Sequence, residues 1–166
     1  MATAENLQDA FAGESQANRK YLAFAKKADD DGMPGVARLF RAAGAAETVH
    51  AHAHLRAMGG IKDVASNLAE AVSGEAHEFK EMYPDFVKEA EAEGNNAAAM
   101  SFRFAMAVEE IHHGFYSEAL ETVQGGNDIS VVSMSVCPIC GNTFKGDGPA
   151  KCPICGTAKT KFFDVE

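Results

Sequence analysis

Four cysteines lie near the end of the chain in two copies of the pattern Cys-Pro-Ile-Cys-Gly. The first copy begins at Cys137, the second begins at Cys152, and eleven residues separate Cys140 from Cys152. Paired C-x-x-C motifs are typical of a tetrahedral site in which four thiolates bind one metal ion. The proline and glycine favour tight turns whose backbone N–H groups face the sulfur atoms. The motifs predict a metal bound by Cys137, Cys140, Cys152 and Cys155.

A second set of polar residues lies where apolar residues would be expected. The pattern Glu-x-x-His occurs twice, at Glu47 with His50 and at Glu109 with His112. On a helix with 3.6 residues per turn, both pairs fall on the apolar face of their segment. Two other segments also place glutamates on their apolar faces, and these are Glu14, Glu75 and Glu78. The chain is therefore predicted to bury a cluster of carboxylates and imidazoles.

Burying five glutamates requires a cation, because unpaired charges would cost more than the whole stability of a domain, roughly 5–15 kcal/mol. The i, i+3 spacing places two side chains on one helix face, so each pair can bind a metal and reach toward its neighbour. Two metal ions about 3.5–4 Å apart fit such an array. Carboxylates and imidazoles suit iron or manganese. Glutamates on two helices with Glu-x-x-His on two others are the ferritin-like di-iron pattern, so we predict a di-iron centre.

The cysteine motifs leave the identity of their metal open. Zinc would make the tail a structural ribbon, whereas iron would make it a one-electron carrier. The predicted di-iron centre needs electrons, and this favours one iron in the four-cysteine site.

The elements that must position these residues follow from the breaks in the chain. Residues 4–124 are rich in Ala, Glu, Leu and Phe, and glycine-containing breaks near residues 32–35, 59–60 and 94–96 divide them into four segments. Four helices of about 25–30 residues predict an all-α four-helix bundle of ferritin-like type. The β-branched run over residues 129–136 predicts a strand that enters the tail. We expect a bundle over 1–126, a linker over 127–133 and a small metal-knuckle domain over 134–166.

The connection between the second and third helices limits the topology. A ferritin-like bundle needs a crossover of about 30 Å there, the length of a 20-residue helix. Only six to eight residues within 58–65 are predicted to be non-helical, and they reach at most about 25 Å when extended. Either the bundle is a simple up-and-down bundle, or helices one and two of one chain complete a bundle with helices three and four of another. We favour the helix-swapped homodimer.

Charge and composition indicate the compartment of the protein and the kinds of partner that it lacks. The formal net charge of −9 argues against a nucleic-acid partner, which would favour a basic face. The N-terminus lacks the features of a signal peptide, and no stretch of about 18 apolar residues occurs, so no membrane partner is expected. A cytoplasmic location is the expectation, and in such a reducing compartment paired C-x-x-C motifs are metal ligands rather than disulfides.

With these motifs in view, the sequence resembles rubrerythrin, a ferritin-like di-iron bundle with a C-terminal rubredoxin-like domain, over nearly its whole length. The resemblance rests on residues 12–17 (AGESQA), 47–50 (ETVH), 74–78 (GEAHE), 81–84 (EMYP) and 109–112 (EEIH), and on both cysteine knuckles. The additional glutamate, Glu78, and the cysteine tail distinguish this pattern from ferritins. One difference is that rubredoxin-like modules usually have an aromatic residue directly after the first knuckle's glycine, where this chain has Asn142.

The resemblance implies a function and roles for individual residues. His50 would bind iron in the reduced state, when one iron moves toward it from Glu78, and Tyr21 and Tyr83 would lie next to the centre. The cysteines would hold a rubredoxin-type iron. Such proteins reduce hydrogen peroxide to water in oxidative stress defence, with electrons from a reductase or rubredoxin. The implied di-iron ligands are Glu14, Glu47, Glu75, Glu78, Glu109 and His112.

Two other functions remain open at this point. The bundle could oxidise Fe(II) as a ferroxidase in iron handling, with a structural zinc in the tail. Alternatively, the protein could be a purely structural metalloprotein whose bundle carries zinc, which predicts a colourless protein.

Overall fold

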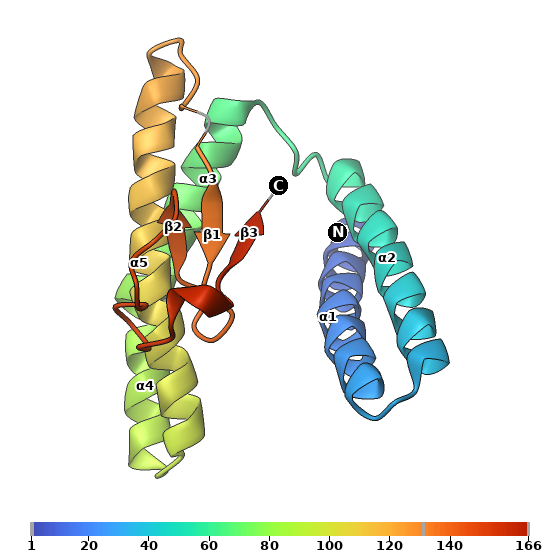
Figure 1. Cartoon of the computed structure of the whole chain (residues 1–166). Coiled ribbons are helices and arrows are strands. Elements are labelled where there is room, and N and C mark those ends of the chain that lie inside the picture. Colours follow the sequence, from blue (N-terminus) through green and yellow to red (C-terminus); the bar gives the residue numbers. More distant parts are fainter. Residues whose placement is uncertain (1, 131, 166) are drawn as a thin grey trace. The chain divides into compact units, whose positions relative to one another are not determined.

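The structure is a computed structural model that describes residues 2–130 and 132–165 (Figure 1). The chain divides into two compact units, Met1–Lys62 and Asp63–Glu166. The first unit contains α1 (Ala2–Asp30) and α2 (Pro34–Ala57). The helices of the second unit are α3 (Val64–His77), a π-helical turn (Glu78–Met82), α4 (Tyr83–Ala92), α5 (Asn96–Gln124) and a short 3-10 helix (Lys159–Lys161). Its strands are β1 (Met134–Val136), β2 (Thr143–Lys145) and β3 (Phe163–Val165).

The first unit is a hairpin in which α1 and α2 lie side by side (Figure 1). Gly32 adopts φ of +72°, which glycine accommodates readily, and Pro34 starts α2 where its missing N–H costs no hydrogen bond. The buried residues of the two helices are small or polar, and they include Ala25, Ala37 and Ala51. Small residues let the helix backbones approach closely, but they bury little apolar area. The hairpin therefore gains little stability from its own contact.

Large apolar side chains of this unit remain uncovered. The exposed fractions of Leu39 and Val49 on α2 are 69% and 64%. On α1, Leu22 and Phe24 are also exposed. A two-helix hairpin with this much exposed apolar surface has a face suited to further packing.

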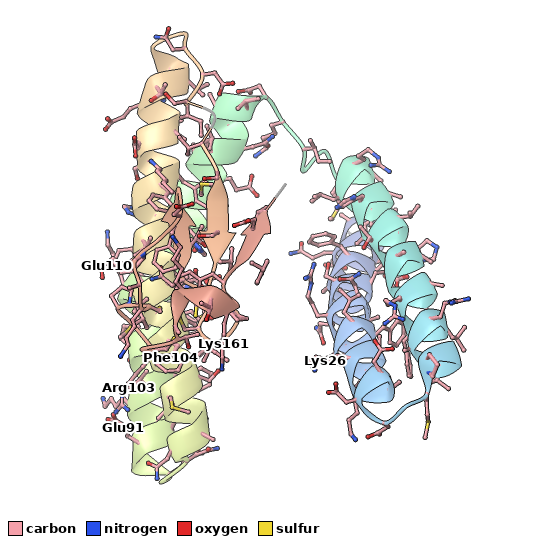
Figure 2. The ribbon with its side chains drawn as sticks, viewed as in Figure 1. Lys26, Glu91, Arg103, Phe104, Glu110 and Lys161 are labelled. Carbon is pink, nitrogen blue, oxygen red and sulfur yellow. The ribbon has the colours of Figure 1, made fainter. Side chains whose placement is uncertain are left out.

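In the second unit, α3 and α4 pack along α5. The side chain of Asp63 caps α3 by accepting a hydrogen bond from the Ser66 backbone N–H at 2.9 Å, and Asn95 caps α5 in the same way. Figure 2 shows Arg103 of α5 beside Glu91 of α4, and the two side chains form an ion pair. The pair is half exposed, so it contributes little, and the apolar contacts between the helices dominate their packing.

The predicted third helix is interrupted. The π-helical turn Glu78–Met82 separates α3 from α4, and the Tyr83 N–H donates to the Glu78 carbonyl five residues earlier. Pro84 has no N–H, so the α-helical hydrogen-bond ladder is broken at this point. A π-turn inserts one extra residue into a helix and changes the direction of the side chains around it. Glu78 is the first residue of this turn.

The tail forms a small antiparallel sheet with the strand order β2-β1-β3. Ser135 of β1 pairs with Phe144 of β2 and with Asp164 of β3. The predicted strand over residues 129–136 is too long, because β1 begins only at Met134, where its three-residue partner strands begin to pair with it. Residue 131 lies outside the described residues. The predicted domain boundaries at 126 and 134 stay predictions.

In the described residues, 2–130 and 132–165, no helix combines the length and the apolar character needed to cross a lipid bilayer.

Candidate metal centres

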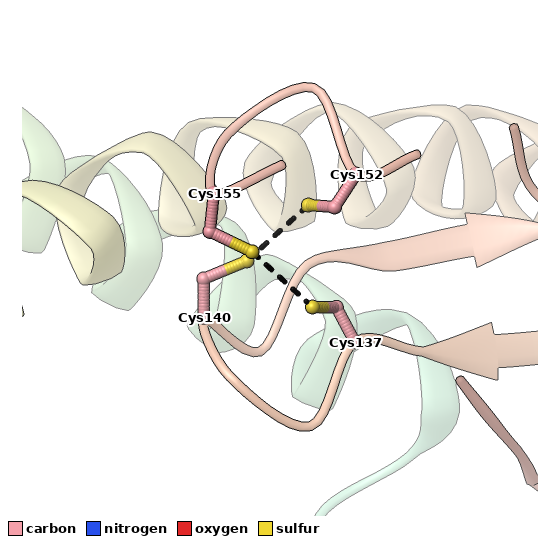
Figure 3. A group of neighbouring side chains, drawn as sticks. All are labelled: Cys137, Cys140, Cys152 and Cys155. Carbon is pink, nitrogen blue, oxygen red and sulfur yellow. Dashed lines mark hydrogen bonds between the residues drawn. The ribbon is translucent and has the colours of Figure 1, made fainter. Parts of the chain in front are cut away.

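The four cysteines converge at one end of the small sheet, with their sulfur atoms facing a common centre (Figure 3). All four sulfurs lie within 4.8 Å of one another, with 3.5 Å between Cys137 and Cys155 and 3.4 Å between Cys140 and Cys152. Metal–sulfur bonds of about 2.3 Å imply a tetrahedron whose edges are about 3.8 Å. The cysteines are free thiols rather than disulfides. This arrangement fits one tetrahedral metal ion.

The two knuckles have the same backbone hydrogen bonds. In the first, the Gly141 N–H donates to the Cys137 carbonyl at 2.9 Å, and in the second the Gly156 N–H donates to the Cys152 carbonyl at 2.9 Å. Both glycines have φ near +80°. Such turns direct N–H groups toward the sulfurs, as the Cys-Pro-x-Cys-Gly pattern predicted.

These N–H groups favour the thiolate form on which metal binding depends. Burial acts to raise the pKa of the Cys152 thiol, but hydrogen bonds from the backbone N–H groups of Cys155 and Ile154 hold that pKa below its usual value. The pKa of Cys155 is also lowered, since hydrogen bonds from Thr157 outweigh the effect of burial. The second knuckle is therefore preorganised to carry negative charge, which a bound cation would offset.

The first unit brings together Glu14 from α1 and the Glu47–His50 pair from α2. The Nδ1 atom of His50 lies 3.0 Å from a Glu47 carboxylate oxygen and 3.7 Å from a Glu14 carboxylate oxygen. The Glu-x-x-His spacing puts both side chains of the pair on the face of α2 that meets α1. Three ligand atoms within 4.8 Å of one another suit one metal ion. We call this group the first triad.

The second unit repeats the arrangement with Glu75 from α3 and the Glu109–His112 pair from α5. The Nδ1 atom of His112 lies 2.8 Å from a Glu109 carboxylate oxygen and 3.9 Å from a Glu75 carboxylate oxygen. Burial, together with the negative charges of Glu109 and Glu78, raises the pKa of Glu75 to about 7. We call this group the second triad. Its crowded carboxylates fit a cation, which would offset their mutual repulsion.

Glu78 lies next to the second triad but outside its three-ligand group. Burial raises the pKa of Glu78, and the negative charge of Glu109 raises it further. The pKa of Tyr83 is also raised, first by burial and then by Glu78, Glu109 and Glu75, so its hydroxyl remains a proton donor. In the first unit, Tyr21 packs against the rings of Phe24 and Phe40.

A contact that the motifs did not predict links the second triad to the cysteine tail. The Nε2 atom of His112 lies 2.9 Å from the Thr143 hydroxyl oxygen, and Thr143 also donates to the Gly141 carbonyl at 3.3 Å. The donation to Gly141 leaves the Thr143 hydroxyl as an acceptor for a proton on His112 Nε2. In that tautomer Nδ1, beside the Glu109 carboxylate, carries the lone pair that metal binding requires. The neighbouring Lys145 pairs with Glu118 and lies over the Phe115 ring, which anchors β2 on α5.

The structure thus brings the predicted residues together in three groups, namely the four cysteines and the two triads. Sequence reasoning missed Thr143. The available signal was its position directly after Asn142, the residue at which the chain departs from the aromatic pattern of rubredoxin-like modules. The role of each residue as a metal ligand stays a prediction.

The fold and these groups define a class of non-haem iron protein, in which a ferritin-like helical domain is joined to a rubredoxin-like four-cysteine module. The family model described as Rubrerythrin matches residues 5–120. The chain belongs to the rubrerythrin family, and the resemblance found in the sequence is confirmed.

Individual relatives agree over nearly the whole chain. Rubrerythrin-2 of Clostridium acetobutylicum is 32% identical, and the alignment covers 96% of this chain and 95% of the relative. Nigerythrin of Nitratidesulfovibrio vulgaris is 36% identical, with 97% of this chain and 85% of the relative covered. A solved structure of nigerythrin in its fully reduced, all-ferrous state has a TM-score of 0.59 and 34% identity, and covers 98% of this chain and 86% of that one.

These findings confirm the predicted fold class and the predicted iron cofactors. The family, the two triads and the cysteine cluster together identify an iron-binding protein of the di-iron type with a second, rubredoxin-like site. The family is one of oxidoreductases, consistent with a role in oxidative stress.

Proposed function

We propose that the protein is a peroxidase that reduces hydrogen peroxide to water, with electrons that pass through the iron of the four-cysteine site. One hydrogen peroxide, two electrons and two protons give two water molecules. The observation that carries the proposal is the contact between Thr143 and His112, because it joins the cysteine module directly to a ligand of the predicted di-iron centre. A structural zinc ribbon would not need to touch that ligand.

In this proposal the di-iron centre is held by both triads together with Glu78. When bound, the two irons supply the two electrons that cleave the oxygen–oxygen bond. The two triads provide four carboxylates and two imidazoles, and Glu78 provides a fifth carboxylate. Five negative charges near two multivalent cations keep the net charge of the site small, which its partly buried setting requires.

Individual side chains would then control the protons and the position of the ligands. The Tyr83 hydroxyl remains protonated, so it can donate a hydrogen bond to Glu78 or to the substrate. His50 is 54% exposed and can move toward or away from a metal, whereas His112 is 27% exposed and is held by Thr143. We assign to His50 and Glu78 the exchange of ligands that accompanies reduction and oxidation.

We further propose that each complete centre combines the first triad of one copy of the chain with the second triad of another. The connection between α2 and α3 comprises only residues 58–63, which span at most about 22 Å when extended. The 24-residue helix α2 is about 36 Å long. This connection cannot serve as a crossover along the bundle. The exposed apolar side chains of the α1–α2 hairpin are the surface that a second copy would cover.

Mixing two inactive variants tests the exchange of helices. Glu14→Ala damages the first triad and Glu75→Ala damages the second, so each variant alone should lose peroxide turnover. A swapped heterodimer contains one centre built from two intact triads, and unfolding and refolding the variants together should restore about a quarter of the wild-type activity by random pairing. Without exchange, every centre contains one damaged triad and no activity returns.

Single-turnover kinetics test the peroxidase proposal itself. The iron-loaded protein is reduced without oxygen and then mixed with hydrogen peroxide. We expect one peroxide to reoxidise the di-iron centre rapidly. Cys152→Ser should leave this single turnover intact but abolish repeated turnover with an external reductant, because the electron supply is broken. Faster consumption of oxygen with added Fe(II) than of peroxide would instead identify a ferroxidase.

A further inference from the structure

Among the described residues, Asn142 is the most deeply buried large side chain outside the cysteines, with 1% of its surface exposed. It directly follows the glycine of the first knuckle, and its carbonyl accepts a hydrogen bond from the Cys137 N–H at 2.9 Å. Its side-chain oxygen, Oδ1, is buried without a hydrogen-bond partner among the described residues. An amide oxygen that is buried without a partner destabilises the folded state. Fold stability alone therefore gives no reason for an asparagine here.

The other end of the same side chain has a specific partner. The amide nitrogen of Asn142 donates to the sulfur of Cys152 at 3.7 Å. Asn142 belongs to the first knuckle and Cys152 to the second, so the amide reaches across the site to the opposite pair of cysteines. Cys152 is itself buried, with 2% of its surface exposed, so water does not compete effectively for the hydrogen bond.

The second knuckle has a more exposed counterpart at the matching position. Thr157 directly follows Gly156, and its carbonyl accepts from the Cys152 N–H at 2.8 Å, as Asn142 accepts from Cys137. The Thr157 hydroxyl lies 3.1 Å from the sulfur of Cys155, but this pair is only half-buried. Side chains after both knuckle glycines thus reach a sulfur, and Asn142 is the one shielded from solvent.

A donor to a ligating sulfur affects the two oxidation states of an iron unequally. Reduction adds one electron and therefore one negative charge to the iron and its four thiolates. An N–H dipole that points at a sulfur stabilises the more negative state, and it does so more strongly where water is excluded. Hydrogen bonds to the sulfurs are among the factors that set such potentials.

We propose that Asn142 sets the reduction potential of the four-cysteine centre, by an amide hydrogen bond to Cys152 that makes the bound iron easier to reduce. This inference rests on the proposed function only in that the iron carries electrons. It assigns a purpose to the asparagine that stands where rubredoxin-like modules usually have an aromatic residue.

The first test is the midpoint potential of the full-length, iron-loaded protein. Asn142→Leu keeps the approximate shape and removes the donor. We expect the equilibrium constant for one-electron reduction of the cysteine-bound iron to fall about tenfold, a shift of about 59 mV to lower potential. Thr143→Val is the matched control, because Thr143 bonds to His112 and to Gly141 rather than to a sulfur, and it should leave this potential unchanged.

A second measurement needs neither iron nor activity and covers the case in which Asn142→Leu does not fold. The sample is unaltered protein whose four cysteines bind an NMR-active cadmium isotope. We expect a scalar coupling between the cadmium and the Asn142 side-chain N–H, because such a coupling is transmitted through an N–H···S hydrogen bond. An unchanged potential in folded Asn142→Leu, or the absence of this coupling, would overturn the proposal. Failure of peroxide turnover alone would contradict the proposed function and leave these two results unaffected.

Discussion

The two triads have the same composition but different surroundings. Each combines a glutamate from one helix with a Glu-x-x-His pair from another, and in each the histidine Nδ1 lies within 3.0 Å of the glutamate of its pair. The first triad has a half-exposed histidine on a simple helical hairpin. The second has Glu78 and a π-turn beside it, carboxyl groups with raised pKa values, and a histidine held by Thr143.

This difference indicates how one set of ligand types can serve two purposes. In the second triad the histidine is fixed and an additional carboxylate is available, whereas in the first the histidine has the greater freedom to move. An iron that changes its charge needs a ligand that can be exchanged, and it also needs ligands that stay in place. Under the proposed function, the first task falls to His50 and Glu78 and the second to His112 and Glu109.

Replacing His112 and His50 in turn should give the largest difference between the two triads, and this difference should appear in iron binding. We expect His112→Ala to weaken iron binding by the bundle by about 100-fold or more, since even partners of a ligand contribute 10–100-fold. His50→Ala should retain two irons in the oxidised protein and slow only turnover. The measurement is the iron content of each variant after dialysis, and the absorbance of the cysteine site, which should not change, serves as the internal reference. Equal iron loss from both variants would show that the two histidines do not differ in how they hold iron.

Removing Glu78 tests the additional carboxylate. Glu78→Ala should slow peroxide turnover at least tenfold, because each 1.36 kcal/mol of lost charge stabilisation is tenfold in rate. The metal of the tail should stay in place. Glu81→Ala is the matched control, since Glu81 lies on the same π-turn but is exposed and pairs with His77. If both variants turn over peroxide at the wild-type rate, the role of Glu78 is wrong.

Thr143 should have a smaller effect. Thr143→Val removes the hydroxyl that holds His112, and we expect about a tenfold loss of iron affinity. Nitrogen NMR of the metal-free protein should show that the tautomer of His112 is no longer fixed. Thr143→Ser restores a hydroxyl and should restore both properties, a rescue that loss of packing alone would not produce.

The smallest expected effect concerns stability and pH in the metal-free protein. The pKa of Glu75 is raised to about 7, so the folded state holds its proton more tightly than the unfolded state. This contribution to stability is present at low pH and is lost as pH rises toward about 7, by less than about 1.4 kcal/mol per pH unit. Chemical denaturation should show that Glu75→Gln flattens this dependence. A steeper loss in the variant would contradict the assignment.

The sequence predicted the parts of the protein that depend on residue type and spacing. Two cysteine knuckles and two Glu-x-x-His pairs led to the metal clusters and the family, because ligand chemistry tolerates few other residues at such positions. The hairpin turn at Gly32 and the capping residues Asp63 and Asn95 follow equally local rules.

Features that depend on distant partners were harder to predict. The extent of β1 depends on the length of the two strands beside it, and the π-turn before Pro84 depends on how a broken hydrogen-bond ladder is repaired. The contact of Thr143 with His112 joins residues 31 positions apart. No periodicity encodes it, because it arises from the packing of the small sheet on α5.

The short segment between Gln124 and Met134 has a kinetic consequence. The nine residues between these elements reach at most about 32 Å even when fully extended, so the tail cannot diffuse away from the helix that carries it. A tether of this length corresponds to an effective concentration in the millimolar range. Under the proposed function, the last electron transfer before peroxide is therefore intramolecular. Dilution of the enzyme in a stressed cell would slow the arrival of its reductant but not this final step.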